Sequence, residues 1–221
     1  MRADTRAEGE MNTRVITIAR TIGSLGEDVA RTIAQRLDFR YVDYQIIQDA
    51  AREAGASPEA VGEAQRTPSI MTRLLETLAR NPSMPEAVWA NPTPLVESPL
   101  YTSSDYRKFV EHVIVDIADR GDAVIVGHAA QAVLRGRPDT VRTLVSGSLD
   151  HRVRRIMSGM GMEESAARKL ARRSDQDRVI YMDRFYETPW LSPDTYDLCI
   201  NTDHLNPEQA AEIVIKTAEL R

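Results

Sequence analysis

The stretch Arg14–Leu37, RVITIARTIGSLGEDVARTIAQRL, decides the fold, because it reads as a buried strand, a glycine turn and a helix in succession. Residues 15–19 form a short apolar run rich in β-branched side chains, which is typical of a strand. From Val29 to Leu37 the apolar residues recur at helical spacing instead. Between the two lies the turn Gly23-Ser24-Leu25-Gly26. We therefore expect a strand, a turn at its carboxyl end, and a helix.

This glycine turn is a candidate anion site. Glycines let the backbone approach a ligand, and a helix starting near Glu27 aims its unpaired N–H groups and positive dipole end at the turn. Phosphate is a common anion at such a place, so the turn and Glu27 and Asp28 are candidates for nucleotide binding. The phosphate-loop pattern G-x-x-x-x-G-K-[S/T] fits poorly, since Thr21 takes its first glycine, Glu27 its lysine and Asp28 its hydroxyl residue. A tight turn without a ligand is the alternative.

Composition and charge narrow the class of protein. The chain has 221 residues, of which 42% are apolar and 28% are charged, as in one soluble α/β domain. Its net charge of −5 argues against non-specific binding to nucleic acid. The single cysteine, Cys199, excludes an internal disulfide framework. No apolar run approaches the roughly 18 residues of a membrane span, and no signal-peptide core is visible. We expect a cytoplasmic protein without nucleic-acid or membrane partners.

Further apolar runs predict the rest of the sheet. Strands are expected at 39–42, 122–127, 141–146 and 197–201. Helical patterns separate them, at 44–54, 57–80, 104–120, 149–160, 163–186 and 207–220, with a short crossing segment at 129–134. Strands that alternate with helices predict a parallel sheet with right-handed crossovers. The expected fold is therefore α/β, with five parallel strands and the first strand central.

Two segments are expected to lie outside regular structure. Residues 1–12 are polar and aperiodic and should form a disordered tail before a single domain at 13–221. Residues 81–99 hold five of the eleven prolines together with Trp89, so they should form a long loop. Such loops act as lids or partner contacts, which makes a homodimer contact one interpretation; packing on its own domain is the other.

Two polar residues follow predicted strands directly. Asp43 ends the second strand and His128 follows the third. Ligands of open α/β sheets bind at the carboxyl ends of the strands, so both side chains are candidates for substrate binding. The alternatives are a helix N-cap for Asp43 and a structural role for His128.

The most basic part of the chain runs from 149 to 186. Arg152, Arg154 and Arg155 are expected to point largely outward from the first of its two helices. The second carries Arg172, Arg173 and Arg178, among several other basic residues, interrupted by Asp175, Asp177 and Asp183. A solvated helix with short-range pairs such as Arg172 to Asp175 is one interpretation. The other is a mobile arginine lid over phosphates, because guanidinium binds phosphate with two parallel hydrogen bonds.

Several motifs occur in a recognisable order. They are the strand, glycine turn and helix; YVD; AVIVG with VLRGRP; VRTLVSGSLDHRVRRIM; RRSDQDR; and YDLCINT. Together they resemble the cytidylate kinase-like family of P-loop proteins over residues 13–220. The resemblance implies a three-layer nucleoside monophosphate kinase fold with a phosphate loop after strand one, an acceptor region near strand two and an arginine lid after strand four. It also implies ATP and Mg²⁺ as cofactors and a nucleoside monophosphate such as CMP as substrate.

The resemblance is incomplete at two cationic positions. Gly23, Ser24 and Gly26 match the family's turn, but relatives carry a basic residue at Glu27. Relatives also read glycine-arginine after strand three, where this chain has Gly127-His128. The lid pattern is retained, with Arg172 or Arg173, Asp175 and Arg178, and Asp197 matches the aspartate near the last strand. Transfer could survive if Glu27 turned to solvent, if Arg20 or a lid arginine reached the terminal phosphate, and if Asp28 bound Mg²⁺.

Three functions remain open from the sequence. The first is a phosphotransferase in which Arg172, Arg173 and Arg178 are catalytic. The second is an inactive nucleotide-binding module with the same fold. The third is a dinucleotide-binding domain, because Gly23-x-x-Gly26 with Asp43 partly mimics that fingerprint. Thr21 replaces the first glycine of the fingerprint, and the arginine lid has no role in it, so we rank this interpretation last.

Overall fold

The computed structural model describes residues 11–43 and 104–221. Its core is one five-stranded sheet, in which every pairing between neighbouring strands is parallel. The strands are β1 (Val15–Arg20), β2 (Arg40–Val42), β3 (Ala123–Val126), β4 (Thr140–Ser146) and β5 (Leu198–Asn201). Their order is β2-β3-β1-β4-β5, which places β1 at the centre. The expected parallel α/β sheet is confirmed.

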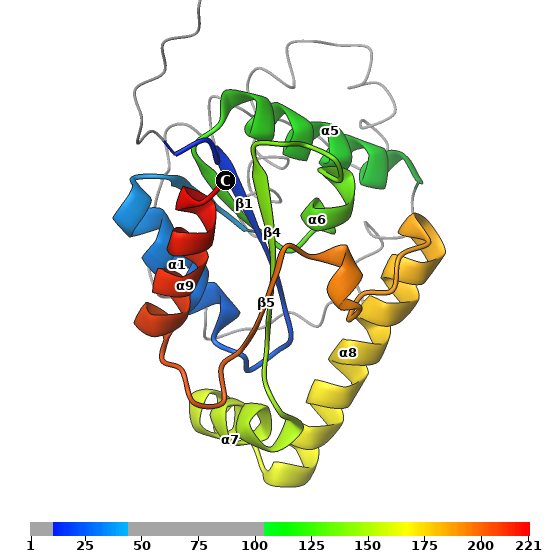
Figure 1. Ribbon diagram of the computed structural model, residues 1–221. Coiled ribbons are helices and arrows are strands. Elements are labelled where there is room, and N and C mark those ends of the chain that lie inside the picture. The colour runs from blue at the N-terminus through cyan, green and yellow to red at the C-terminus, as the bar shows by residue number, and fades with distance from the viewer. Residues whose placement is uncertain (1–10, 44–103) are drawn as a thin grey trace, which may run out of the picture.

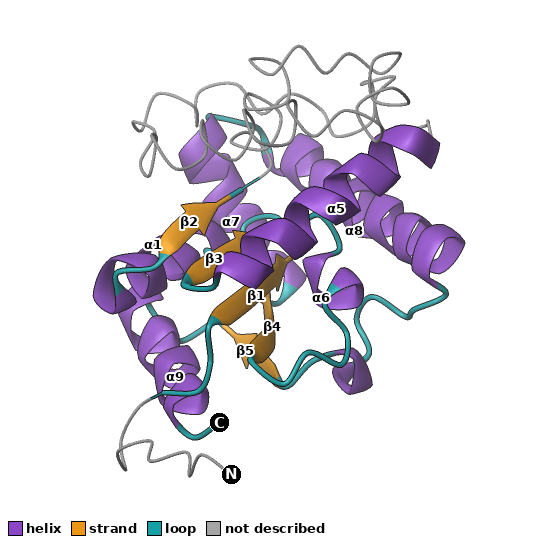
Figure 2. Ribbon diagram, turned by 90° about the horizontal axis from the view of Figure 1, so that it is seen from above, coloured by secondary structure: helices purple, strands orange, loops and turns teal. Residues whose placement is uncertain are grey.

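Helices cover both faces of the sheet (Figures 1 and 2). On one face lie α1 (Gly26–Leu37) and α9 (Pro207–Glu219), which pack against each other. On the other lie α5 (Ser104–Arg120) and the short α6 (Ala130–Val133). Two further helices, α7 (Leu149–Met160) and α8 (Glu164–Tyr186), extend beyond the carboxyl end of β4 and pack together, and a 3₁₀ turn covers Pro193–Thr195. The expected helices at 44–54 and 57–80, the loop at 81–99 and residues 1–10 lie outside the described residues.

The main core forms between the sheet and the α1/α9 layer. Ile16 and Ile18 of β1 point to this side and are fully buried, as are Val29 and Ile33 of α1. Burial of an aliphatic side chain of this size contributes about 1.5 to 3 kcal/mol, so packing of β1 against α1 stabilises both elements.

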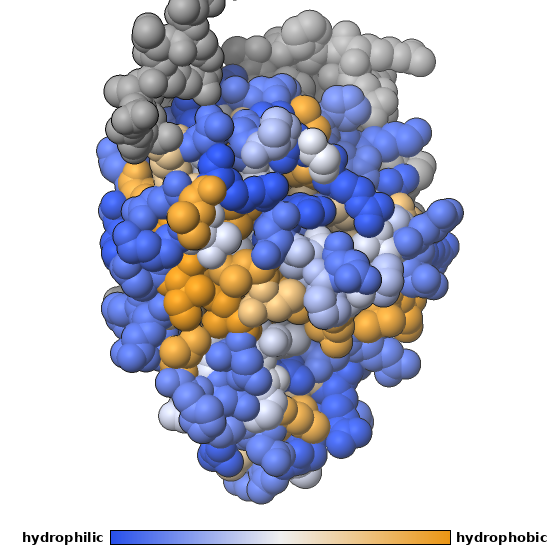
Figure 3. Space-filling view, in the orientation of Figure 1, coloured by the Kyte–Doolittle hydropathy of each residue, from blue (hydrophilic) through white to orange (hydrophobic). Residues whose placement is uncertain are grey.

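In the described ranges, 11–43 and 104–221, no helix is long and apolar enough to cross a membrane. Figure 3 shows hydrophilic residues over much of α7 and α8, and an apolar area between α9 and β5.

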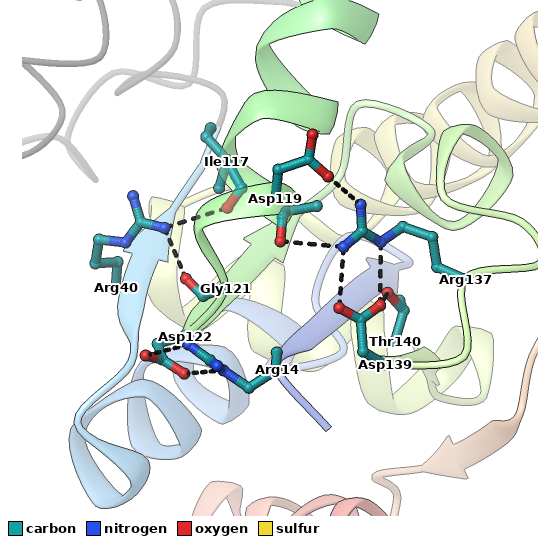
Figure 4. Close-up of polar contacts among 10 residues, drawn as sticks. Arg14, Arg40, Ile117, Asp119, Gly121, Asp122, Arg137, Asp139 and Thr140 are labelled. Atoms are coloured by element: carbon teal, nitrogen blue, oxygen red, sulfur yellow. Dashed lines mark hydrogen bonds and ion pairs between the residues drawn. The ribbon is translucent and has the colours of Figure 1, made fainter. Parts of the chain in front are cut away.

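The amino ends of the strands are closed by arginine contacts (Figure 4). Arg14 donates two hydrogen bonds to Asp122, at 2.7 and 2.9 Å, and so joins the starts of β1 and β3. Arg137 donates hydrogen bonds to Asp119 and Asp139, and the bond to Asp139 lowers the pKa of that carboxyl group. Arg40 donates to the carbonyl oxygen of Gly121, among others. These contacts serve the fold, because ligands of parallel sheets bind at the opposite edge.

The strand order separates the three functional interpretations. In the dinucleotide-binding order 3-2-1-4-5-6, strand two lies beside strand one, so its terminal carboxylate is next to the glycine turn. Here β3 lies between β1 and β2. The ends of β1, β3 and β2 therefore bring the glycine turn, Gly127-His128 and Asp43 to one edge, in that order. This topology disfavours the dinucleotide-binding interpretation and retains the other two.

Candidate active site

The glycine turn is held in place by its own serine and by the segment after β5. Gly23 has a φ of +78° and Leu25, the N-cap of α1, a φ of +63°, so two residues of the turn are left-handed. Ser24 Oγ lies 2.8 Å from the carbonyl oxygen of Thr21 and 3.1 Å from that of Val145. The carbonyl oxygen of Ser24 accepts a hydrogen bond from Thr202 Oγ1 at 2.8 Å. The N-cap residue Leu25 makes no side-chain hydrogen bond to the first turn of α1, and the uncapped start of a helix favours an anion.

The two glycines of the turn are required by contacts within the protein. A Cβ atom at Gly23 would lie 2.7 Å from the carbonyl oxygen of Arg152, and one at Gly26 would lie 2.8 Å from Cγ of Arg20. Larger residues at either position would push the turn away from α7 or push Arg20 out of its place. The glycines thus bring the turn close to protein atoms, a reason for their presence that the sequence pattern alone did not reveal.

Glu27, at the lysine position of the phosphate-loop pattern, forms an ion pair with Arg20. Arg20 Nε donates to Glu27 Oε1 at 2.7 Å, and the side chains are 18% and 26% exposed. Burial favours the neutral form of both groups, but their mutual charge and hydrogen bond outweigh it, so the pKa of Glu27 is lowered and that of Arg20 raised. The positive charge of Arg178 also lowers the pKa of Glu27. Glu27 does not turn to solvent, which was one condition for transfer to survive, because its side chain pairs with the part-buried guanidinium of Arg20.

The structure brings Arg20, His128 and Asp43 to the same edge of the sheet. Arg20 Nη1 lies 2.6 Å from the place where Gly127 would carry a Cβ atom. The next residue, His128, is left-handed, with a φ of +55°. Burial, and secondarily the charge of Arg20, lowers the pKa of His128 to about 3, so its imidazole is neutral at pH 7. The negative charge of Asp43 reaches Arg20 and favours its ionised form.

Two arginines of α7 connect the turn to its surroundings. Arg152 is 5% exposed and donates to both carboxylate oxygens of Asp175, at 3.0 and 2.7 Å. Arg155 donates to the carbonyl oxygens of Gly23, at 3.3 Å, and Thr202, at 2.6 Å. The expectation that both point outward is wrong. Their spacing of three residues, which puts side chains on one helical face, was the available signal.

Of the three candidate lid arginines on α8, Arg178 is the one whose charge acts on Glu27. Its Nη1 donates to the carbonyl oxygen of Ser174 at 3.1 Å, and its guanidinium lies 5.5 Å from the ring centre of Trp190. Arg172 and Arg173 are exposed. Asp175, the expected partner of Arg172, instead accepts hydrogen bonds from Arg152 of α7. Asp197 accepts hydrogen bonds from Arg142 at the start of β5, where it serves the fold.

Asp28 is the residue that could hold a metal ion. Its carboxyl group stands in the first turn of α1, and burial followed by the charge of Glu27 raises its pKa. Within residues 11–43 and 104–221 there is no group of three or more metal-binding side chains. Magnesium at nucleotide sites is held by one or two carboxylates and the phosphates themselves, so a single aspartate beside the glycine turn fits this metal.

A glycine turn between a central parallel strand and a helix, faced by an arginine-bearing helix, defines a kinase-like protein with a P-loop type of fold. The chain belongs to the cytidylate kinase-like family, whose model matches residues 15–204. It is 29% identical over 113 residues to a cytidylate kinase from Pyrobaculum aerophilum, a match that covers 51% of this chain and 60% of that relative. Membership of this family indicates that the chain is a nucleotide kinase-like protein.

Two solved structures support the fold. An uncharacterized protein from Eubacterium ventriosum aligns with a TM-score of 0.61 at 20% identity, covering 95% of this chain and all of that one. A shikimate kinase from Bacteroides thetaiotaomicron aligns with a TM-score of 0.51 at 12% identity, covering 93% and 98%. At these identities the likeness concerns the fold alone.

Proposed function

We propose that the protein transfers a phosphoryl group from ATP to a nucleoside monophosphate such as CMP. The observation that carries the proposal is the grouping of Arg20, Glu27 and Arg178 at the glycine turn. Two guanidinium groups around one carboxylate leave a net charge of +1, the same as the lysine of the common phosphate loop. A unit charge about 4 Å from a phosphate is worth roughly 4 kcal/mol at an effective dielectric of 20, so a net positive charge at the turn would favour binding of ATP.

Each candidate residue has a role in this reaction. N–H groups of the stretch 23–28, other than that of Ser24, which donates to Thr21, would bind the phosphates of ATP at the positive end of α1. Bound Mg²⁺ would neutralise phosphate charge, with Asp28 as its protein ligand. Arg178 would stabilise the charge on the transferred group. Arg172 and Arg173 would join it only after a movement of α8, and Asp43 and His128 would contact the acceptor.

A nucleotide-binding module without transfer activity is the second candidate. It is favoured by the acidic residue at the lysine position and by the neutral His128, whose pKa of about 3 prevents it from supplying positive charge at pH 7. Both candidates require nucleotide binding. They differ in whether ATP is consumed.

Calorimetric titration with ATP, ADP and CMP, with and without Mg²⁺, tests the shared requirement. A coupled assay over the common nucleoside monophosphates then separates the candidates. We expect Arg178→Ala to lower transfer by orders of magnitude, and Arg154→Ala, an exposed arginine of α7, to leave it unchanged. Binding without transfer would favour the module. Absence of binding at millimolar nucleotide would remove both.

A further inference from the structure

Arg20, the last residue of β1, reaches across to the end of the neighbouring strand β3. Its aliphatic part lies against Gly26 at the start of α1, and its Nη1 stands over Gly127. A side chain at position 127 would occupy the place of the guanidinium. Gly26 and Gly127, which are far apart in the sequence, therefore both make room for Arg20 at the carboxyl edge of the sheet.

The hydrogen bond from Arg20 to Glu27 uses Nε and leaves the donors on Nη1 and Nη2 for another acceptor. Glu27 accepts from Nε at 2.7 Å. In the part of the chain that the structure describes, neither Nη1 nor Nη2 donates a hydrogen bond to a protein acceptor. A guanidinium carries five N–H donors in a rigid fork, and the fork binds a phosphate oxygen pair with two parallel bonds. Glu27 fixes the Nε side and thereby orients the rest.

The position of the fork favours one of the two nucleotides. The guanidinium lies on the β3 side of β1, toward Asp43 at the end of β2. The glycine turn, by contrast, is tied through Ser24 and Thr202 to β4 and the segment after β5, on the other side of β1. We infer that Arg20 binds the phosphate group of the acceptor nucleoside monophosphate, beside the neutral His128. This inference rests on the proposed function and names the residue that supplies positive charge to the acceptor.

Separate titrations of ATP, CMP and cytidine into the full chain test the inference. The variants are Arg20→Ala and the double variant Arg20→Met with Glu27→Gln, which leaves no unpaired carboxylate and protects the fold. The matched control is Arg36→Ala, which removes an exposed ion pair between α1, the helix of Glu27, and Glu212 of α9. Thermal unfolding of every variant verifies that it is folded.

We expect both Arg20 variants to bind CMP about 10-fold to 100-fold more weakly, the range of a lost charged hydrogen bond, with cytidine affinity unchanged. The discrimination between CMP and cytidine should therefore fall by the same factor, which a merely structural defect would not produce. The double variant removes both members of the Arg20–Glu27 pair and so keeps the net charge at the turn, and its ATP affinity should change by less than threefold. Arg36→Ala should change neither affinity.

Other outcomes overturn the inference in distinct ways. If the folded variants lose ATP affinity and keep CMP affinity, Arg20 serves the donor. If both affinities are kept, the arginine is structural, and the proposed function stands without it. If the wild-type chain binds neither nucleotide, the proposed function fails and the inference fails with it.

Discussion

His128 makes the stability of the protein depend on pH in the window in which histidines titrate. Its pKa is lowered from 6.5 to about 3 in the folded chain, because burial and the charge of Arg20 disfavour the imidazolium. A group that is neutral when folded and protonated when unfolded stabilises the fold above its unfolded pKa. The contribution is therefore complete above pH 6.5 and is lost as the pH falls toward 3.

The size of the loss follows from the two pKa values. Between pH 7.5 and pH 5 the unfolded imidazole takes up a proton and the folded one does not, which lowers the free energy of unfolding by about 2 kcal/mol. Against a typical stability of about 5 to 15 kcal/mol, this is measurable by urea unfolding at the two pH values. Carboxylates contribute little in this window because their unfolded pKa values lie near 4.

Two variants isolate the effect. His128→Asn should abolish most of the loss, since asparagine does not titrate and tolerates the left-handed backbone at this position. His112→Asn, on the exposed side of α5, is the matched control and should retain the loss. If wild type and His128→Asn lost the same free energy between pH 7.5 and pH 5, a His128 that stays neutral in the folded chain would be refuted.

Two further predictions concern ion pairs, and urea unfolding at pH 7 measures both. Glu27→Gln should lower the free energy of unfolding by about 3 kcal/mol, because it leaves the part-buried guanidinium of Arg20 without its carboxylate. Asp28→Asn, in the same helical turn, should leave the free energy of unfolding unchanged or slightly raised, since the raised pKa of Asp28 means that its charge is unfavourable in the fold. Equal losses of stability in the two variants would contradict a stabilising Glu27–Arg20 pair. Asp175→Asn removes the bidentate acceptor of a buried arginine of α7 and should cost about 3 to 5 kcal/mol. Asp177→Asn, whose own ion pair is exposed and 3.9 Å long, should cost less than about 1 kcal/mol, and a similar cost for both would argue against a structural role of the buried pair.

Much of the architecture could be predicted from the sequence because it depends on local patterns. The β-branched run predicts the strand β1 and the apolar residues at helical spacing predict α1. The alternation of strands with helices predicts a parallel sheet. The same reasoning placed Asp43 and His128 at one edge, since the carboxyl ends of parallel strands coincide there. The glycine turn was recognisable for a similar reason, as two glycines standing where the period changes.

The sequence by itself determined the elements, the parallel sheet and the edge at which the candidate residues meet. Only the tertiary structure decided which charges pair. Glu27 could face solvent or Arg20, and Asp175 could pair with Arg172 or with Arg152 on another helix. Local spacing favours the neighbour in sequence, whereas burial favours whichever partner satisfies a desolvated charge, and that depends on how α7, α8 and β1 pack. Ion pairs between elements are therefore a property of the packed fold, because their free energy comes from desolvation that no single segment experiences alone.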